Sequence, residues 1–265
     1  MNDNLSKYLI SNTIVWENVS VKSLFVLFVL AVSIAFCGQG ETTAHENHAS
    51  TTPTRLKVTF DPPAEDMPKT SMGGASRSIG QCVNMDATEF AVPFSAVLPT
   101  NDGGLTVAAH PTVLAYLPET SANKLFFSWR DENNGDHYQT ILPIDRTGIV
   151  SLTLPEDAPP LEIGKNYQWA LGIMCDGRLQ PDSPMVQGQV KRVAIAPDLS
   201  DRLQNASSLE RAVLYGEAGI WYETVATLAR LKKTQPQNWN VVANWQDLLT
   251  SVGLAEIAEV STDDL

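Results

Sequence analysis

Hydrophobic and polar residues alternate along two neighbouring stretches in the middle of the chain. In Gly148–Leu154, valine or leucine stands at positions 150, 152 and 154, and from Tyr167 to Cys175 every second residue is Tyr, Trp, Leu, Ile or Cys. This period of two is typical of half-buried β-strands. Prolines 155, 159 and 160 separate the two stretches, and proline cannot donate to a strand ladder. The pattern therefore predicts two strands joined by a proline-bounded corner.

Other short apolar segments follow one another along the chain, with Pro, Gly, Asn or Asp at their ends. They are Leu56–Phe60, Val92–Leu98, Leu105–Ala108, Thr112–Leu117, Lys124–Arg130, His137–Leu142 and Met185–Ile195. The run Asn133–Asp136 predicts a hairpin turn because asparagine and glycine tolerate positive φ. Many short strands with frequent turns predict a mainly β domain over residues 55–197, an antiparallel β-sandwich of the immunoglobulin or fibronectin type.

The corner itself carries a more specific signal. Leu161, Gly164 and Tyr167 precede or begin the second strand, and Trp169 follows on the same face as the tyrosine. This order is similar to the tyrosine corner of immunoglobulin-like and fibronectin-type sandwiches, in which the phenol hydroxyl bonds back to the preceding turn. We expect Tyr167 to make that bond, although a generic loop before an amphipathic strand fits the same residues.

After Pro197 the apolar period changes from two to about 3.6, the period of a helix. Ser207 and Glu210 form a capping box before one helix, and a second helix is expected over Ile220–Lys233. A further helix around Trp245 should end at Gly253. Short helices are marginally stable alone in water. We therefore expect residues 198–265 to form a helical hairpin or small helical tail packed on the sandwich.

The N-terminal 54 residues show no pattern of a folded domain. Leu24–Cys37 is an uninterrupted apolar run after Lys22, which is typical of a signal peptide within residues 1–38. An uncleaved membrane anchor and lipidation of Cys37 are alternatives. Residues 39–54 are expected to be a flexible tether, and His45 and His48 within it to be solvated. Each alternative places the domain outside the cytoplasm: periplasmic, cell-surface or secreted, or membrane-anchored.

Two of the three cysteines, Cys82 and Cys175, lie within the exported part. An even number of cysteines in an exported chain indicates a disulfide. Closing a loop of this length would stabilise the fold by roughly 4–5 kcal/mol in the chain-entropy account. Two buried free thiols are the alternative.

Charge excludes one class of partner. The formal net charge is −12, and lysines and arginines form no cluster along the chain. Nucleic-acid binding depends on such clusters, so we expect no nucleic acid as partner. The sequence also indicates no cofactor and no metal. Membrane contact is expected only through the N-terminal segment, if it is uncleaved or lipidated.

Several segments in the same order resemble a largely cyanobacterial family, the domain of unknown function 928. The matching segments are Gly80–Cys82, Gly104–Val107, Pro111–Thr112, Gly148–Leu152, Pro159–Trp169, Cys175–Asp176, Ala218–Tyr222, and Trp245 with Leu248–Leu249. The resemblance implies an exported protein of unassigned activity, and it brings no catalytic residues with it.

Two kinds of function remain open from the sequence. One is an exported, envelope-associated binding or assembly protein that contacts another protein or a surface polymer, with Trp221 and Tyr222 as a possible partner surface. The alternative is a hydrolase or a calcium-dependent module. For these, the candidates are the histidines and acids with Ser128, namely His110, His137, Asp131, Glu132 and Asp136. Their spacing does not distinguish a site from surface residues, so we expect no catalytic residues.

Overall fold

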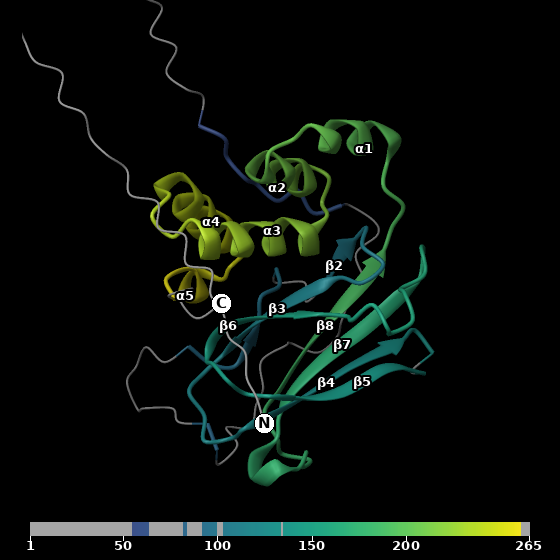
Figure 1. The fold of residues 1–265 in the computed structure, drawn as a ribbon, viewed down its shortest axis with the longest axis vertical. Helices are drawn as coiled ribbons and strands as arrows, with labels where there is room; N and C mark the ends of the chain where they lie inside the picture. The colour runs from purple at the N-terminus through teal and green to yellow at the C-terminus, as the bar shows by residue number, and fades with distance from the viewer. Residues whose placement is uncertain (1–54, 64–81, 84–91, 100–102, 134, 261–265) are drawn as a thin grey trace, which may run out of the picture. The chain divides into compact units, whose positions relative to one another are not determined.

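The computed structural model describes residues 55–63, 82–83, 92–99, 103–133 and 135–260 (Figure 1). All of them belong to one compact unit, Thr51–Leu265. The expected signal peptide and tether lie outside the described residues, as does most of the loop expected between Pro62 and Gly80. Among the described helices, none is long and apolar enough to cross a bilayer.

The described residues form two β-sheets. In the three-stranded sheet, β3 (Thr112–Leu117) lies between β1 (Ser95–Ala96) and β6 (Gly148–Thr153) and is antiparallel to both. The other sheet has five strands in the order β2 (Gly103–Thr106), β8 (Met185–Arg192), β7 (Asn166–Ile173), β4 (Lys124–Asp131) and β5 (Asp136–Pro143). Expectation and structure thus agree on most strands to within a few residues.

The expectation of a purely antiparallel fold is wrong at one edge. β2 runs parallel to β8, with Gly103 opposite Gln189 and Thr106 opposite Arg192. Alternation along a strand reports which side chains are buried, and it carries no information about the direction of the neighbouring strand. The five-stranded sheet is therefore mixed.

The strand expected at Leu56–Phe60 is also absent, because this segment pairs with helices instead of a sheet. Residues 55–63, which we call the strap, are extended and pass beside the C-terminal helices (Figure 1). The Val58 amide donates to the side-chain oxygen of Asn244 at 2.6 Å, and the Asp61 amide donates to the Gly216 carbonyl at 3.1 Å. Apolar and polar residues can alternate in this segment as they do in a strand, because any extended backbone places successive side chains on opposite sides.

The C-terminal part contains five α-helices within the described residues. They are α1 (Pro197–Gln204), α2 (Ser208–Glu217), α3 (Trp221–Thr234), α4 (Trp239–Ser251) and α5 (Ala255–Ala258). Ser207 and Glu210 form the expected capping box at α2. The short helices α1 and α5 were not expected. Pro197 occupies the first turn of α1, where its missing N–H costs nothing, so it begins a helix there.

Helix α3 covers part of the three-stranded sheet. It contacts β2 and β3, and in Figure 1 it lies between α2 and these strands. Consecutive residues of β6, Ile149 and Val150, are consequently only 1% and 7% exposed. Side chains of both sheets and of the helices belong to one hydrophobic core. The alternation in Gly148–Leu154 predicts one exposed face, and Ser151 and Thr153 on that face are exposed; Ile149 on the same face is buried instead.

Cys82 and Cys175 form the expected disulfide, with their Cα atoms 5.6 Å apart. Cys175 lies in a short 3-10 turn, η1 (Cys175–Gly177), just after β7. On the other side, the carbonyl of Cys82 accepts from the Thr120 hydroxyl at 2.6 Å and from the Ser121 amide at 2.9 Å. The bond thus joins the end of β7 to the connection between β3 and β4.

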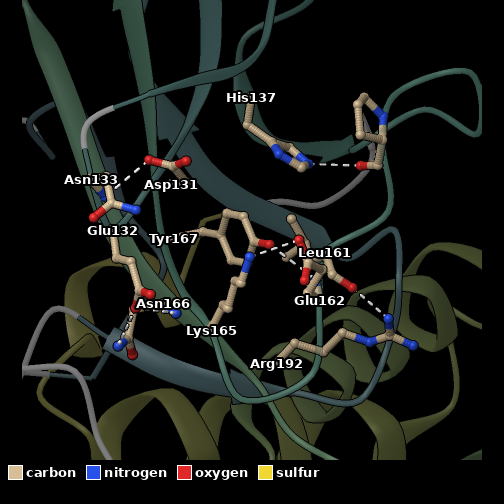
Figure 2. A network of polar contacts seen from close by, with 11 residues as sticks. Asp131, Glu132, Asn133, His137, Leu161, Glu162, Lys165, Asn166, Tyr167 and Arg192 are labelled. Atoms are coloured by element: carbon tan, nitrogen blue, oxygen red, sulfur yellow. Dashed lines mark hydrogen bonds and ion pairs between the residues drawn. The ribbon is translucent and has the colours of Figure 1, made fainter.

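The corner before β7 is built on Tyr167, whose hydroxyl accepts from the Glu162 amide at 3.0 Å (Figure 2). Leu161 is fully buried, and its carbonyl accepts from the guanidinium of Arg192 on β8. Gly164 has φ of +86°, which glycine adopts without strain. Trp169, two residues along the strand, is fully buried as well. The four corner residues singled out in the sequence therefore hold a tight turn against the core.

We expect loss of the disulfide to destabilise the fold strongly. The bond closes a separation of 93 residues, so the double variant C82S/C175S should lose roughly 4–5 kcal/mol of unfolding free energy. Urea unfolding of the native chain with and without a reductant should show the same loss, and the reductant should not affect the double variant. Recovery of both residues as free thiols from native material would contradict this expectation.

Tyr167→Phe should lower the free energy of unfolding by about 1 kcal/mol, because the Glu162 amide loses its acceptor in a part-buried site. Tyr138→Phe, at a half-buried tyrosine of β5, is the matched control and should cost less. Chemical denaturation of the three proteins measures the difference. Equal midpoints for the Tyr167 variant and the native chain would show that the corner bond does not support the fold.

Candidate functional site

Trp221 and Tyr222, the expected partner surface, are buried, so that expectation is wrong. They are 0% and 2% exposed. The Trp221 indole donates to the carbonyl of Val97 at 3.0 Å, and the Tyr222 hydroxyl donates to the carbonyl of Gln189 at 2.9 Å. The same hydroxyl accepts from the indole of Trp169 at 3.0 Å. Burial raises the pKa of Tyr222 far above its ordinary range, so the phenol stays protonated. These side chains attach α3 to the sheets.

The residues considered for hydrolysis serve the fold instead. Nε2 of His110 lies 3.1 Å from the carbonyl oxygen of Ala158, and Nε2 of His137 lies 2.7 Å from that of Pro159. Because a carbonyl only accepts, each ring donates from Nε2. The Asp131 carboxylate accepts from the amides of Asn133 and Gly135 and closes the β4–β5 turn. These bonds do not connect a histidine, an acid and Ser128 into a relay.

The acids considered for calcium point to separate partners. Glu132 accepts from the Asn166 side chain at 3.3 Å, and Asp136 lies 3.6 Å from the guanidinium of Arg130. Within the part of the chain that the structure describes, no three His, Cys, Asp or Glu side chains lie together as a metal site would require. The hairpin thus brings these acids near one turn without converging them on one point.

A cavity of about 820 Å³ lies between the three-stranded sheet and the helices α2 and α3. Such a volume is within the usual range of ligand sites. Its apolar lining residues are Ala108, Leu117, Leu125, Leu142, Pro143, Ile144, Ile149, Val150, Leu152, Ala226 and Ala229. Its polar and aromatic lining residues are His110, Thr112, Asp145, Arg146, Ser151, Arg211, Tyr215, Tyr222, Glu223, Thr227, Arg230 and Lys233. The lining of the cavity therefore combines apolar and polar side chains.

Basic side chains from three elements meet at this cavity. Arg211 comes from α2, Arg230 and Lys233 from α3, and Arg146 from the connection between β5 and β6. All four residues are exposed, while the apolar lining includes fully buried Leu117. Glu223, Arg230 and Lys233 share one face of α3, because residues three, four or seven apart are neighbours on a helix. The positive charge is thus at the rim and the apolar surface is deeper.

Glu223 lies at the wall of this cavity and binds the end of β2. Its Oε1 accepts from the Thr106 hydroxyl at 2.6 Å, the Val107 amide at 3.2 Å and the Ala108 amide at 3.0 Å. Its Oε2 is buried and accepts no hydrogen bond from the described residues. Burial raises the pKa of the carboxyl, and the hydrogen bond from Thr106 only partly opposes this effect. Glu223 is therefore held closer to its neutral form than an exposed glutamate.

Tyr215 on α2 also lines the cavity, and charged side chains of α2 and α3 affect the pKa of its phenol. Burial has the largest effect and raises the pKa of the Tyr215 phenol, and the carboxyl of Glu223 raises this pKa further. The guanidinium groups of Arg211 and Arg230 act in the opposite direction. The phenol of Tyr215 thus responds to charges from both α2 and α3.

The sequence did not identify this site. Of the lining residues, only His110 and Tyr222 had been considered for a function, and for other reasons. Arg230 and Lys233 share a helix face with Glu223, which is a detectable pattern. However, Arg146 and Arg211 are far apart in sequence, and their positions near this face depend on how the helices pack on the sheet.

Glu223→Gln should change how stability depends on pH. The folded-state pKa of Glu223 is raised, so protonation stabilises the fold at low pH. This contribution is lost as the pH rises from the ordinary carboxyl value of about 4.3 through the folded pKa. Glutamine keeps an acceptor for Thr106 and carries no charge. The stability of the variant relative to the native chain should therefore increase between pH 4 and pH 7, as measured by urea unfolding.

Glu210→Gln is the matched control for this experiment. Hydrogen bonding to Ser207 lowers the pKa of Glu210, so its stabilising effect is present at high pH and is lost as the pH falls. The relative stability of this variant should therefore decrease as the pH rises from the lowered folded pKa to the ordinary carboxyl value of about 4.3, and change little above it. The same trend in both variants would refute the assignment of a raised pKa to Glu223.

Comparisons with known proteins give a family and little else. No curated protein matches the chain. Among solved structures, the chain is similar to the fn3 domain of human collagen alpha-1(XX) chain, with 16% identity over 34% of this chain and 77% of that chain. The TM-score of 0.24 is too low to support an argument about the fold. The model of the family described as Domain of Unknown Function (DUF928) matches residues 72–262. Because this match covers most of the sequence, the chain belongs to the DUF928 family.

Proposed function

We propose that this protein is an exported, envelope-associated binding protein that holds an acidic surface polymer at the cavity between the three-stranded sheet and α3. The polymer would present carboxylate or sulfate groups to Arg230, Lys233 and their neighbours. Its sugar rings would lie against Tyr215 and the apolar wall, since a saccharide has polar edges and apolar C–H faces.

The observation that carries this proposal is the gathering of basic side chains on an acidic chain. The whole chain has a formal net charge of −12, yet four exposed basic residues line one cavity. One of them, Arg146, lies 3.6 Å from Asp145, which offsets part of the charge. Burial raises the pKa of Glu223, which reduces the negative charge that this carboxyl adds. A local positive region of this kind attracts an anion even when the molecule as a whole repels it.

Localisation outside the cytoplasm is part of the proposal. The Cys82–Cys175 disulfide supports it, because such bonds persist in oxidising compartments. A periplasmic, cell-surface or secreted location would give the cavity access to envelope polymers.

We also propose that the two sheets form a sandwich of the fibronectin type. Three observations support this architecture. The strands divide into a three-stranded and a five-stranded sheet, and both sheets contribute to one core. Tyr167 bonds back to its corner at the start of β7, as the tyrosine of such sandwiches does. Exposed connections of a sandwich commonly carry binding residues, and Arg146 lies in one.

Binding can be measured by calorimetry with polygalacturonate and dextran sulfate, and with neutral dextran for comparison. We expect binding of the acidic polymers only, with an affinity that falls as salt is added. The double variant R230A/K233A should bind roughly tenfold more weakly, since each exposed ionic contact contributes up to about 1 kcal/mol.

The control is R178A/R202A, which removes the same charge from exposed residues outside the cavity lining. It should retain the affinity of the native chain. Equal weakening by both double variants would indicate a general charge effect and no defined site. Failure of both acidic polymers to bind at low salt would reject an acidic polymer as the ligand.

A further inference from the structure

The strap is bound in the way that a receptor binds an extended peptide. The side-chain amide of Asn244 contacts its backbone twice: Oδ1 accepts from the Val58 amide at 2.6 Å, and Nδ2 donates to the Leu56 carbonyl at 3.0 Å. Asn244 is fully buried in α4, where the Asn240 carbonyl also accepts from its Nδ2 at 2.8 Å. A buried, oriented carboxamide thus offers one donor and one acceptor to an extended backbone.

Two glycines at the end of α2 let the strap backbone approach closely. A Cβ atom at Gly216 would lie 2.0 Å from the carbonyl oxygen of Thr59, and one at Gly219 would lie 2.7 Å from that of Asp61. The Gly216 carbonyl also accepts from the Asp61 amide at 3.1 Å. The site is therefore shaped to the backbone of its occupant as well as to its side chains.

Two apolar side chains anchor the strap. Val58 is only 1% exposed, and the ring of Phe60 meets the Trp221 ring edge-on at 4.9 Å between centroids. At the start of the strap, the Arg55 guanidinium lies 3.6 Å from the Asp247 carboxylate and 5.3 Å from the centre of the Trp239 ring. These contacts select an extended segment with a basic residue followed by two alternating apolar ones.

We propose that the helices α2, α3 and α4 form a receptor site for this extended segment, and that residues 55–63 of a second copy of the chain bind there in place of the molecule's own strap. Such an exchange repeats every strap contact in the partner, so it costs little interaction energy. Reciprocal exchange gives a closed two-fold dimer. The cavity would be unaffected, because it lies on the other side of α3, against the sheet.

The chain length permits the exchange. Eighteen residues, 64 to 81, separate the strap from Cys82, where the disulfide holds the chain to the core. Fully extended, they reach roughly 60 Å, at about 3.3 Å per residue. The molecule's own strap has an effective concentration of the order of millimolar, because it belongs to the same chain as the site. Monomers should therefore dominate in dilute solution, and exchange should require high concentration or refolding of concentrated chains.

Two complementary variants of the full chain test the proposal. Val58→Asp places a charge at a buried anchor and so damages the strap but leaves the receptor site intact. Gly216→Ala blocks the receptor site but leaves the strap intact. Mixed together, they should form a one-to-one heterodimer, seen by native mass spectrometry, whereas each alone should stay monomeric. The control mixture of Gly216→Ala with the double variant V58D/G216A should form none, because neither chain then has an open site.

Wild-type protein gives a second, independent measurement. Chains refolded at roughly 1 mM should contain dimers by size exclusion with light scattering, and chains refolded at roughly 1 µM should be monomers. Heterodimers restricted to the complementary mixture would support the proposal. Folded variants that form no heterodimer would overturn it. If a variant does not fold, the wild-type measurement decides: monomers at every refolding concentration would overturn strap exchange.

Discussion

The attachment of α3 to the two sheets is the constraint on which the other features depend. It consists of two consecutive aromatic residues whose polar atoms are satisfied inside the core. Trp221 bonds to Val97, next to the three-stranded sheet, and Tyr222 bonds to Gln189 and Trp169 in the five-stranded sheet. A buried phenol or indole without a partner would be costly, so the helix has one position and one orientation at which these bonds are made.

Once α3 is held in this position, its remaining faces acquire distinct environments. Glu223, Arg230 and Lys233 line the cavity with the sheet, while Trp221 also packs against Phe60 of the strap. Helix α2 is divided in the same way between consecutive residues. Tyr215 lines the cavity, whereas Gly216 accommodates the strap backbone. The helical tail therefore contributes to two separate sites through its position against the sheets.

Glu223 affects both the stability of the fold and the charge of the cavity. Its Oε1 satisfies three donors at the end of β2, the edge strand that runs parallel to β8, and so secures that edge to the helix. Its Oε2 is buried without a hydrogen bond from the described residues. A fully charged carboxylate there would add cost by desolvation and would reduce the positive charge of the cavity. The raised pKa lessens both effects.

Much of the local structure could be predicted from the sequence: most strands, the capped start of α2, the corner around Tyr167 and the pairing of Cys82 with Cys175. The strands, the cap and the corner depend on period or turn chemistry within a short segment, and the disulfide was predicted from the number of cysteines in the exported part. The parallel pairing of β2 could not be predicted in this way, because alternation does not encode the direction of the neighbouring strand. The burial of Trp221 and Tyr222 also depends on long-range packing. The same is true of the binding of the strap by the helices. The cavity likewise forms only through tertiary packing, because Arg146 and Arg230 line the same cavity only when the tail packs on the sheet. Contacts between residues distant in sequence leave no periodic signal, and only the packed chain reveals them.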